Sequence, residues 1–111
     1  MDVTVEPRSD GAAVVRLVGR LDLASAEAVK QQLVQAVGAG HRQLVVDLDG
    51  VDFLDSSGLG ALIGGLKVAR VARGNLRIAR PNDQVRLVLE LTTLDRVLHP
   101  YATVEEALAG Y

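Results

Sequence analysis

Residues 47–65 read DLDGVDFLDSSGLGALIGG and lie between a strand-like run and a helix-like run. Residues 44–48 are mostly β-branched or aliphatic, which is typical of a strand covered on both faces. After the loop, apolar side chains recur at helical spacing, which predicts a helix from about residue 57 to residue 73, closed by Gly74. A buried strand that leads into an amphipathic helix is typical of α/β proteins.

The segments before this stretch predict a hairpin and a helix. Residues 2–6 alternate polar and apolar side chains, residues 12–18 are largely apolar, and a Ser-Asp-Gly turn separates them. Two strands this close are most simply antiparallel. Apolar positions within residues 25–37 recur at i, i+4, i+7 and i+8, which predicts an amphipathic helix that stops at Gly38 to Gly40.

The segments after it continue the alternation of strands and helices. Residues 76–79 predict a strand, Asn82 is a plausible cap for a following helix, and the T-x-x-E pattern of Thr103 and Glu106 predicts a last short helix. The order is β-β-α-β-α-β-α-(β)-α. It predicts one α/β domain over residues 1–111, with a mixed sheet of about four to five strands and about four helices. In that sheet the N-terminal hairpin is antiparallel and the remainder is parallel.

The composition excludes several classes of function. The chain has 111 residues, no cysteine, 3% aromatic residues and a net charge of −2. The absence of a basic excess and of stacking aromatics disfavours nucleic-acid binding, and the lack of thiols excludes disulfides and thiolate metal sites. No apolar run approaches the roughly 18–20 residues that span a bilayer, and the N-terminus is unlike a signal peptide. We therefore expect a cytoplasmic protein without membrane or nucleic-acid partners.

One enzyme motif is partly matched within the central stretch. The run VVDLDGV resembles the nucleophile motif of haloacid-dehalogenase-type phosphatases, which would make Asp47 and Asp49 catalytic beside Mg²⁺. Those enzymes are longer and use a downstream lysine with a later acidic pair. Here Lys67 is the only lysine after Gly50, and no paired aspartates follow. We interpret the two aspartates as turn-capping residues at a strand end.

Other catalytic and cofactor motifs do not fit. The spacing of Gly58, Gly60 and Gly64 has one residue too many for a dinucleotide-binding fingerprint, and it begins well past the expected strand end at Leu48. Neither serine of the loop stands in a G-x-S-x-G pattern. The two histidines, His41 and His99, are interpreted as structural or exposed. We expect no catalytic residue, no metal and no cofactor.

The run Asp55-Ser56-Ser57-Gly58 fits a helix N-terminus that carries a hydroxyl group. Ser and Asp side chains accept hydrogen bonds from the unpaired N–H groups of a first helical turn, and the same groups tolerate an added phosphate. Phosphorylation of Ser56 would add roughly −1.5 to −2 charge beside Asp52 and Asp55. Two interpretations stay open at this point: an ordinary cap, or a switch at a protein interface that leaves the fold unchanged.

The glycines in and around this helix lower its stability, by roughly 0.8–1 kcal/mol each relative to alanine in a helix interior. We expect packing or binding to offset that loss. Gly60 and Gly64 are four residues apart and share one face of the helix. Either that face packs closely on the sheet, or it offers a flat surface to the backbone of another protein. The sequence leaves both possibilities open.

These residues together resemble the STAS domain, the sulfate-transporter and anti-sigma-factor-antagonist family, over nearly the whole chain. The specific part is the DSSGLG loop within VDFLDSSGLG at residues 51–60, after the strand at residues 44–48. The GRLD block at residues 19–22, the Ala-Ser-Ala at residues 24–26 and TVEEALA at residues 103–109 support it.

The resemblance implies a non-enzymatic anti-sigma factor antagonist. Ser56 would be phosphorylated by an anti-sigma factor with serine-kinase activity, and a PP2C-type phosphatase would restore it. The unphosphorylated form would bind that kinase and release a sigma factor, and ATP would belong to the partner. Asp22, Asp55, Ser57 and Gly58 would form the docking surface, and we expect Gly60 to belong to it as well. We expect a monomer or weak dimer; the alternative is a STAS scaffold or sensor subunit of a larger signalling complex.

Overall fold

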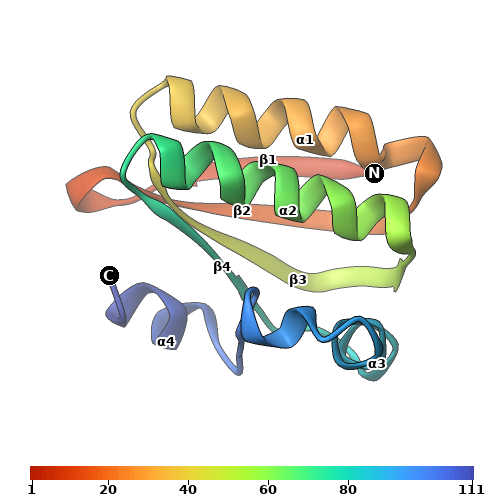
Figure 1. The fold of residues 1–111 in the computed structure, drawn as a ribbon. Helices are drawn as coiled ribbons and strands as arrows, with labels where there is room; N and C mark the ends of the chain where they lie inside the picture. Colours follow the sequence, from red (N-terminus) through yellow and green to blue (C-terminus); the bar gives the residue numbers. More distant parts are fainter.

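Five strands form one mixed sheet in the computed structural model, which describes residues 1–111 (Figure 1). The strands follow one another across the sheet in chain order: β1 (Asp2–Pro7), β2 (Ala12–Leu21), β3 (Gln43–Leu54), β4 (Asn75–Ala79) and β5 (Pro100–Tyr101). β1 pairs with β2 antiparallel, and every later pair is parallel. The predicted hairpin and the predicted parallel remainder are therefore confirmed.

Four α-helices pack around this sheet. They are α1 (Leu23–Gly38), α2 (Ser56–Val71), α3 (Asp83–Leu91) and α4 (Val104–Ala109), and two short 3₁₀ turns lie at Ser9–Gly11 and Leu94–Arg96. α1 and α2 lie side by side over one face of the sheet, and α4 lies beneath the other face (Figure 1). None of the helices combines the length and the apolar character needed to cross a membrane.

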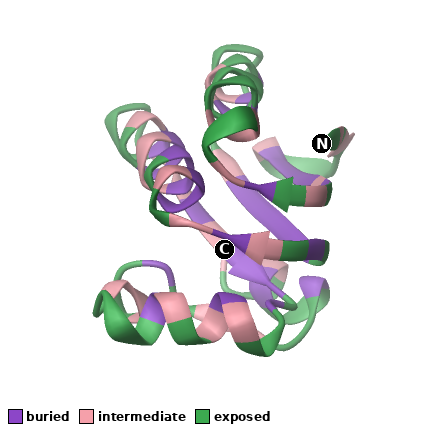
Figure 2. Cartoon of the chain, turned by 90° about the vertical axis from the view of Figure 1, so that its right-hand side faces the viewer, coloured by how far each residue is buried: buried purple, intermediate pink, exposed green.

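The two strands β2 and β3 are buried on both faces, as the β-branched run predicts for β3. One set of alternate residues, including Leu17, Leu44 and Val46, belongs to a cluster of 20 buried residues shared with α1, α2 and α3. The intervening residues, such as Val14 and Val45, belong to a cluster of five shared with α4. Figure 2 shows the same division: buried colour runs along the middle of the strands and the inner faces of α1 and α2, and exposed colour covers their outer faces.

β3 is longer than the sequence predicts, and this difference places the candidate site. Its expected end at Leu48 is wrong, because the strand continues through DGVDF to Leu54. Asp and Gly are depleted in strands, but parallel pairing with β2 overrides that preference, with two shifts in register along the pair. Gly50 is required there, since a Cβ at this position would lie 2.8 Å from the carbonyl oxygen of Leu17. β2 likewise runs past Gly19, its expected end, to Leu21.

The helix boundaries shift by one or two residues as well. α1 begins at Leu23 rather than residue 25, and α2 begins at Ser56 rather than residue 57 and ends at Val71 rather than residue 73. The loops that join these strands to these helices therefore shrink to one residue each, Asp22 and Asp55. Both aspartates become helix caps at one edge of the sheet.

Candidate functional site

The N-termini of α1 and α2 meet at the edge of the sheet where β2 and β3 end. The two strands are parallel neighbours and finish in register, with Leu21 opposite Leu54. A single residue then leads from each strand into its helix, so the two helices start side by side (Figure 1, right). Figure 2 turns this edge towards the viewer. All the residues of the DSSGLG loop lie here.

Asp55 joins the two helix starts. Its Oδ1 accepts a hydrogen bond from the N–H of Gly58 at 2.8 Å, which caps α2, and its Oδ2 accepts one from the N–H of Leu23 at 3.1 Å, in the first turn of α1. The N–H of Asp55 itself donates to the carbonyl oxygen of Leu21 at 3.3 Å. Each of these N–H groups at the two helix starts is an orphan donor of its own helix. One carboxylate therefore fixes the relative position of both helix starts.

Asp22 caps α1 through a reciprocal capping box that the sequence analysis missed. Its Oδ1 accepts from the N–H groups of Ala24 and Ser25 at 3.1 and 3.3 Å, and Ser25 Oγ accepts from the N–H of Asp22 at 3.1 Å. Burial alone would raise the pKa of Asp22, but these backbone hydrogen bonds and the neighbouring Arg20 outweigh burial and hold that pKa below its ordinary value. Asp22 is therefore a fixed negative charge beside the loop.

Ser56 is the first residue of α2, and it is exposed. The run Asp55–Gly58 does begin a helix, as predicted, and its cap is the carboxylate of Asp55 rather than the hydroxyl of Ser56. Its hydroxyl lies one residue inside the positive end of the helix dipole, where an anion is favoured. Ser57, the next residue, is partly buried. Of the two serines, Ser56 is the more accessible to another protein.

The glycines of α2 divide into packed and open positions, and the face shared by Gly60 and Gly64 does not pack on the sheet, since a Cβ added at Gly64 would lie 3.0 Å from Lys30 Cε of α1. A Cβ added at Gly58 would lie 2.0 Å from the carbonyl oxygen of Leu21, and one at Gly65 would lie 2.6 Å from Leu33 Cδ1. These two glycines allow close packing. Gly60 is exposed, and an added Cβ would meet nothing within 4 Å. The fold of the domain therefore does not require glycine at position 60.

Two features of this edge are invisible in the sequence. Leu23 leaves 78% of its surface exposed although it is a large apolar residue. Arg20 and Phe53 lie opposite each other on β2 and β3, with the guanidinium carbon 4.2 Å from the ring centroid. In the sequence, Leu23 is one apolar residue within GRLDLAS at residues 19–25, and its exposure was not predicted.

Asp47 is the only buried charged residue, and it lies outside this edge. Arg80 donates to both of its carboxylate oxygens, at 3.0 and 2.6 Å, and Arg16 donates to one of them. Burial would raise the pKa of Asp47, but the hydrogen bonds from Arg80 and from the N–H of Asp49, with the charges of both arginines, lower it. The carboxylate that would serve as a phosphatase nucleophile is therefore held in an ion-pair network.

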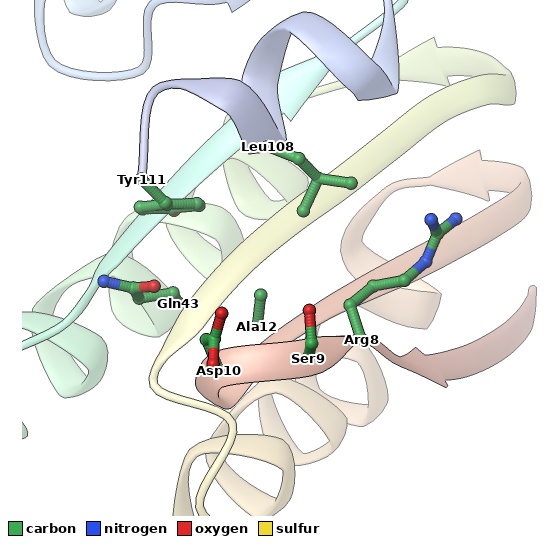
Figure 3. A pocket seen from close by; sticks show the side chains of 7 residues that line it. All are labelled: Arg8, Ser9, Asp10, Ala12, Gln43, Leu108 and Tyr111. Atoms are coloured by element: carbon green, nitrogen blue, oxygen red, sulfur yellow. The ribbon is translucent and has the colours of Figure 1, made fainter.

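The remaining candidates lie elsewhere in the fold. His41 precedes β3, so the full length of that strand separates it from Ser56, and His99 packs edge-on against Tyr101. A hollow of about 260 Å³ opens where β2 and β3 begin, between Tyr111 and Asp10 (Figure 3). It lies at the strand ends away from Ser56 and is not part of the candidate site.

The sequence matches one family along most of its length. The profile of the STAS domain matches residues 5–107. The chain belongs to the STAS domain family. The resemblance noted in the DSSGLG loop and its flanking blocks is thus confirmed, and the fold described above is the STAS fold.

Relatives of this STAS domain with similar length are anti-sigma factor antagonists by name. The anti-sigma-F factor antagonist RsfB of Mycobacterium tuberculosis is 32% identical over 108 residues, covering 91% of this chain and 82% of the relative. The anti-sigma F factor antagonist of Paenibacillus polymyxa is 29% identical, covering 88% of this chain and 85% of the relative.

Solved structures of two anti-sigma factor antagonists have the same fold as this chain. An anti-sigma factor antagonist from Mycobacterium paratuberculosis superposes with a TM-score of 0.86 at 30% identity, covering 98% of this chain and 92% of that one. The anti-sigma factor antagonist SpoIIAA in its unphosphorylated form superposes with a TM-score of 0.81 at 26% identity, covering 96% of this chain and 93% of that one.

Proposed function

We propose that this STAS domain is an anti-sigma factor antagonist that has no catalytic activity of its own. Its unphosphorylated form binds an anti-sigma factor with serine-kinase activity, in the cytoplasm where transcription takes place, and this binding releases a sigma factor. Phosphorylation of Ser56 ends the binding, and a PP2C-type phosphatase reverses it. The family, the names of the relatives and the existence of SpoIIAA in an unphosphorylated and a phosphorylated form support the proposal.

The observation that carries the proposal is the position of Ser56. The residue is exposed at the start of α2, and Asp55 supplies the cap, so the hydroxyl can react without loss of a structural hydrogen bond. In the transfer, Ser56 Oγ forms a bond to the γ-phosphorus of ATP, the bond between that phosphorus and ADP breaks, and a base of the kinase takes the hydroxyl proton. Hydrolysis by the phosphatase returns serine and inorganic phosphate.

The phosphate would act on binding and leave the fold intact. It would bring roughly −1.5 to −2 charge next to Asp55, and the N–H groups and dipole of α2 offset part of that repulsion within the domain. A partner packed closely against Ser56 would have no such offset. We therefore expect similar thermal stability for the two forms and a large difference in affinity for the anti-sigma factor.

The predicted docking residues take two roles in this proposal. Asp22, Ser57 and Gly60 form the surface around Ser56, while Asp55 and Gly58 hold the two helix starts that carry it. An exposed glycine inside a helix costs stability without a packing reason. We propose that Gly60 leaves room for the backbone of the anti-sigma factor, so that Gly60→Ala binds it more weakly although the free domain is no less stable.

A phosphorylation assay with purified kinases tests the switch. Each kinase-type anti-sigma factor encoded in the same genome is incubated with ATP and the parent chain, Ser56→Ala or Ser57→Ala, and the intact mass is measured. One added phosphate on the parent chain and on Ser57→Ala, with none on Ser56→Ala, is the expected result. No phosphorylation of any form by any of these kinases would refute the switch. A stable high-order particle in size-exclusion chromatography would instead favour the scaffold or sensor alternative, since we expect a monomer or weak dimer.

A further inference from the structure

Leu23 is a large apolar side chain exposed beside the phosphorylation site. It is the first residue of α1, and 78% of its surface is open to solvent. The first turn of a helix has no need of an apolar residue there. Exposure alone decides little, because Val71 and Leu91 are exposed to a similar degree and single apolar residues are common on surfaces. Leu23 differs from those residues in its position at the start of α1, next to the start of α2.

Leu23 is fixed relative to Ser56 by one carboxylate. Its N–H donates to Asp55 Oδ2 at 3.1 Å, and Asp55 is the residue directly before Ser56 and the cap of its helix. No other exposed large apolar residue donates its N–H to Asp55. The backbone of Leu23 is therefore fixed next to the residue that precedes Ser56, at the adjoining starts of α1 and α2.

We propose that Leu23 is the apolar anchor of the surface around Ser56: the anti-sigma factor buries its side chain in an apolar hollow next to Ser56. The proposal rests on the proposed function, because the occupant is the same partner. It also explains how phosphorylation of Ser56 would release the anti-sigma factor. A partner that closes over Leu23 excludes water from the neighbouring hydroxyl, and a phosphate there would lose its hydration without gaining a partner charge. Desolvation, more than long-range repulsion, would then release the complex.

Val71 supplies a matched control. It is exposed to 88%, and it is the last residue of α2, about 22 Å along the helix axis from Ser56 at 1.5 Å per residue. Truncation of Val71 removes exposed apolar surface without touching the two helix starts.

Affinity measurements with purified proteins test the proposal. Leu23→Ala, Leu23→Gln and Val71→Ala are titrated by calorimetry against each kinase-type anti-sigma factor of the same genome. Leu23→Gln keeps a side chain of comparable size and puts a polar amide in place of the two methyl groups of leucine. We expect both Leu23 variants to bind about tenfold more weakly than the parent chain, the effect of losing one buried interface side chain, and Val71→Ala to bind within twofold. Thermal melts of all forms should coincide within a few degrees, because Leu23 contributes little to the core.

Each outcome decides a separate point. Equal affinity of the Leu23 variants and the parent chain for an anti-sigma factor would overturn the anchor and leave the proposed function standing. Failure of every anti-sigma factor to bind the parent chain would overturn both. Ser56→Asp is also titrated at about 50 mM and 500 mM salt. Desolvation predicts weak binding at both concentrations, and recovery of binding at high salt would refute it, because salt screens repulsion.

Discussion

Gly58 and Gly60 lie two residues apart in α2, and the structure predicts opposite effects of the same substitution on stability. At Gly58 an added Cβ would lie 2.0 Å from the carbonyl oxygen of Leu21 and 2.8 Å from Leu21 Cγ. Ordinary contacts are about 3.5 Å, so the end of β2 and the start of α2 must separate by more than about 1 Å. At Gly60 the same atom meets nothing within 4 Å.

The magnitudes follow from these contacts. Overpacking of this kind costs about 1–3 kcal/mol, and separation endangers the hydrogen bond from Asp55 N–H to Leu21 O, a further ~1 kcal/mol. Alanine returns about 1 kcal/mol of helix propensity at either site. Gly58→Ala should therefore lower the free energy of unfolding by about 1–3 kcal/mol, and Gly60→Ala should raise it by about 0.5–1 kcal/mol.

Urea unfolding followed by circular dichroism measures both changes. The parent chain and the two variants should unfold with the same dependence on urea, and only the midpoints should differ, since the surface exposed on unfolding is unchanged. Gly58→Ala with a midpoint equal to that of the parent chain would refute the close approach of α2 to β2. A lower midpoint for Gly60→Ala would show that position 60 is needed for packing, and would remove the argument that it is reserved for a partner.

Two further predictions concern hydrogen bonds at other parts of the fold. Asp47→Asn should lower the free energy of unfolding by about 1.5–3 kcal/mol, because Arg16 and Arg80 lose their shared carboxylate. Since the pKa of Asp47 is lowered in the folded state, its contribution is complete above the unfolded pKa, near 3.8, and is lost as the pH falls further. The difference between parent and Asp47→Asn in urea midpoint should therefore shrink below about pH 4; a constant difference would contradict the ion pairs. Tyr111→Phe should lower the free energy of unfolding by ~1 kcal/mol at neutral pH in the same assay, because the Tyr111 hydroxyl donates a hydrogen bond to Leu44 O at 2.6 Å. The ring of Tyr111 lies against Arg77, and the substitution keeps that contact. An unchanged free energy of unfolding would contradict the hydrogen bond.

The sequence predicted the parts of this fold that depend on local pattern. Apolar spacing marked the helices, β-branched runs marked the strands, and the DSSGLG loop indicated the family. The end of β3 was missed because Asp49 and Gly50 are poor strand residues, and only pairing with β2, some 30 positions away in the chain, keeps them extended.

The structure of the site needed tertiary information for the same reason. Asp55 was recognised as a residue of the loop, but its hydrogen bond to Leu23 joins positions 32 residues apart. The burial of Asp47 between Arg16 and Arg80 likewise depends on partners 31 and 33 residues away. The exposure of Leu23 in the first turn of α1 was not predicted, because the expected helix began only at residue 25.

The affinity of Ser56→Ala and Ser56→Asp for the anti-sigma factor that phosphorylates the parent chain tests the central claim most directly. The account predicts that Ser56→Ala binds as tightly as the unphosphorylated parent chain, and that Ser56→Asp binds at least a hundredfold more weakly while its thermal melt is unchanged. Equal affinity of the two variants would contradict it, and Ser56 would then be an exposed helix residue without a part in switching.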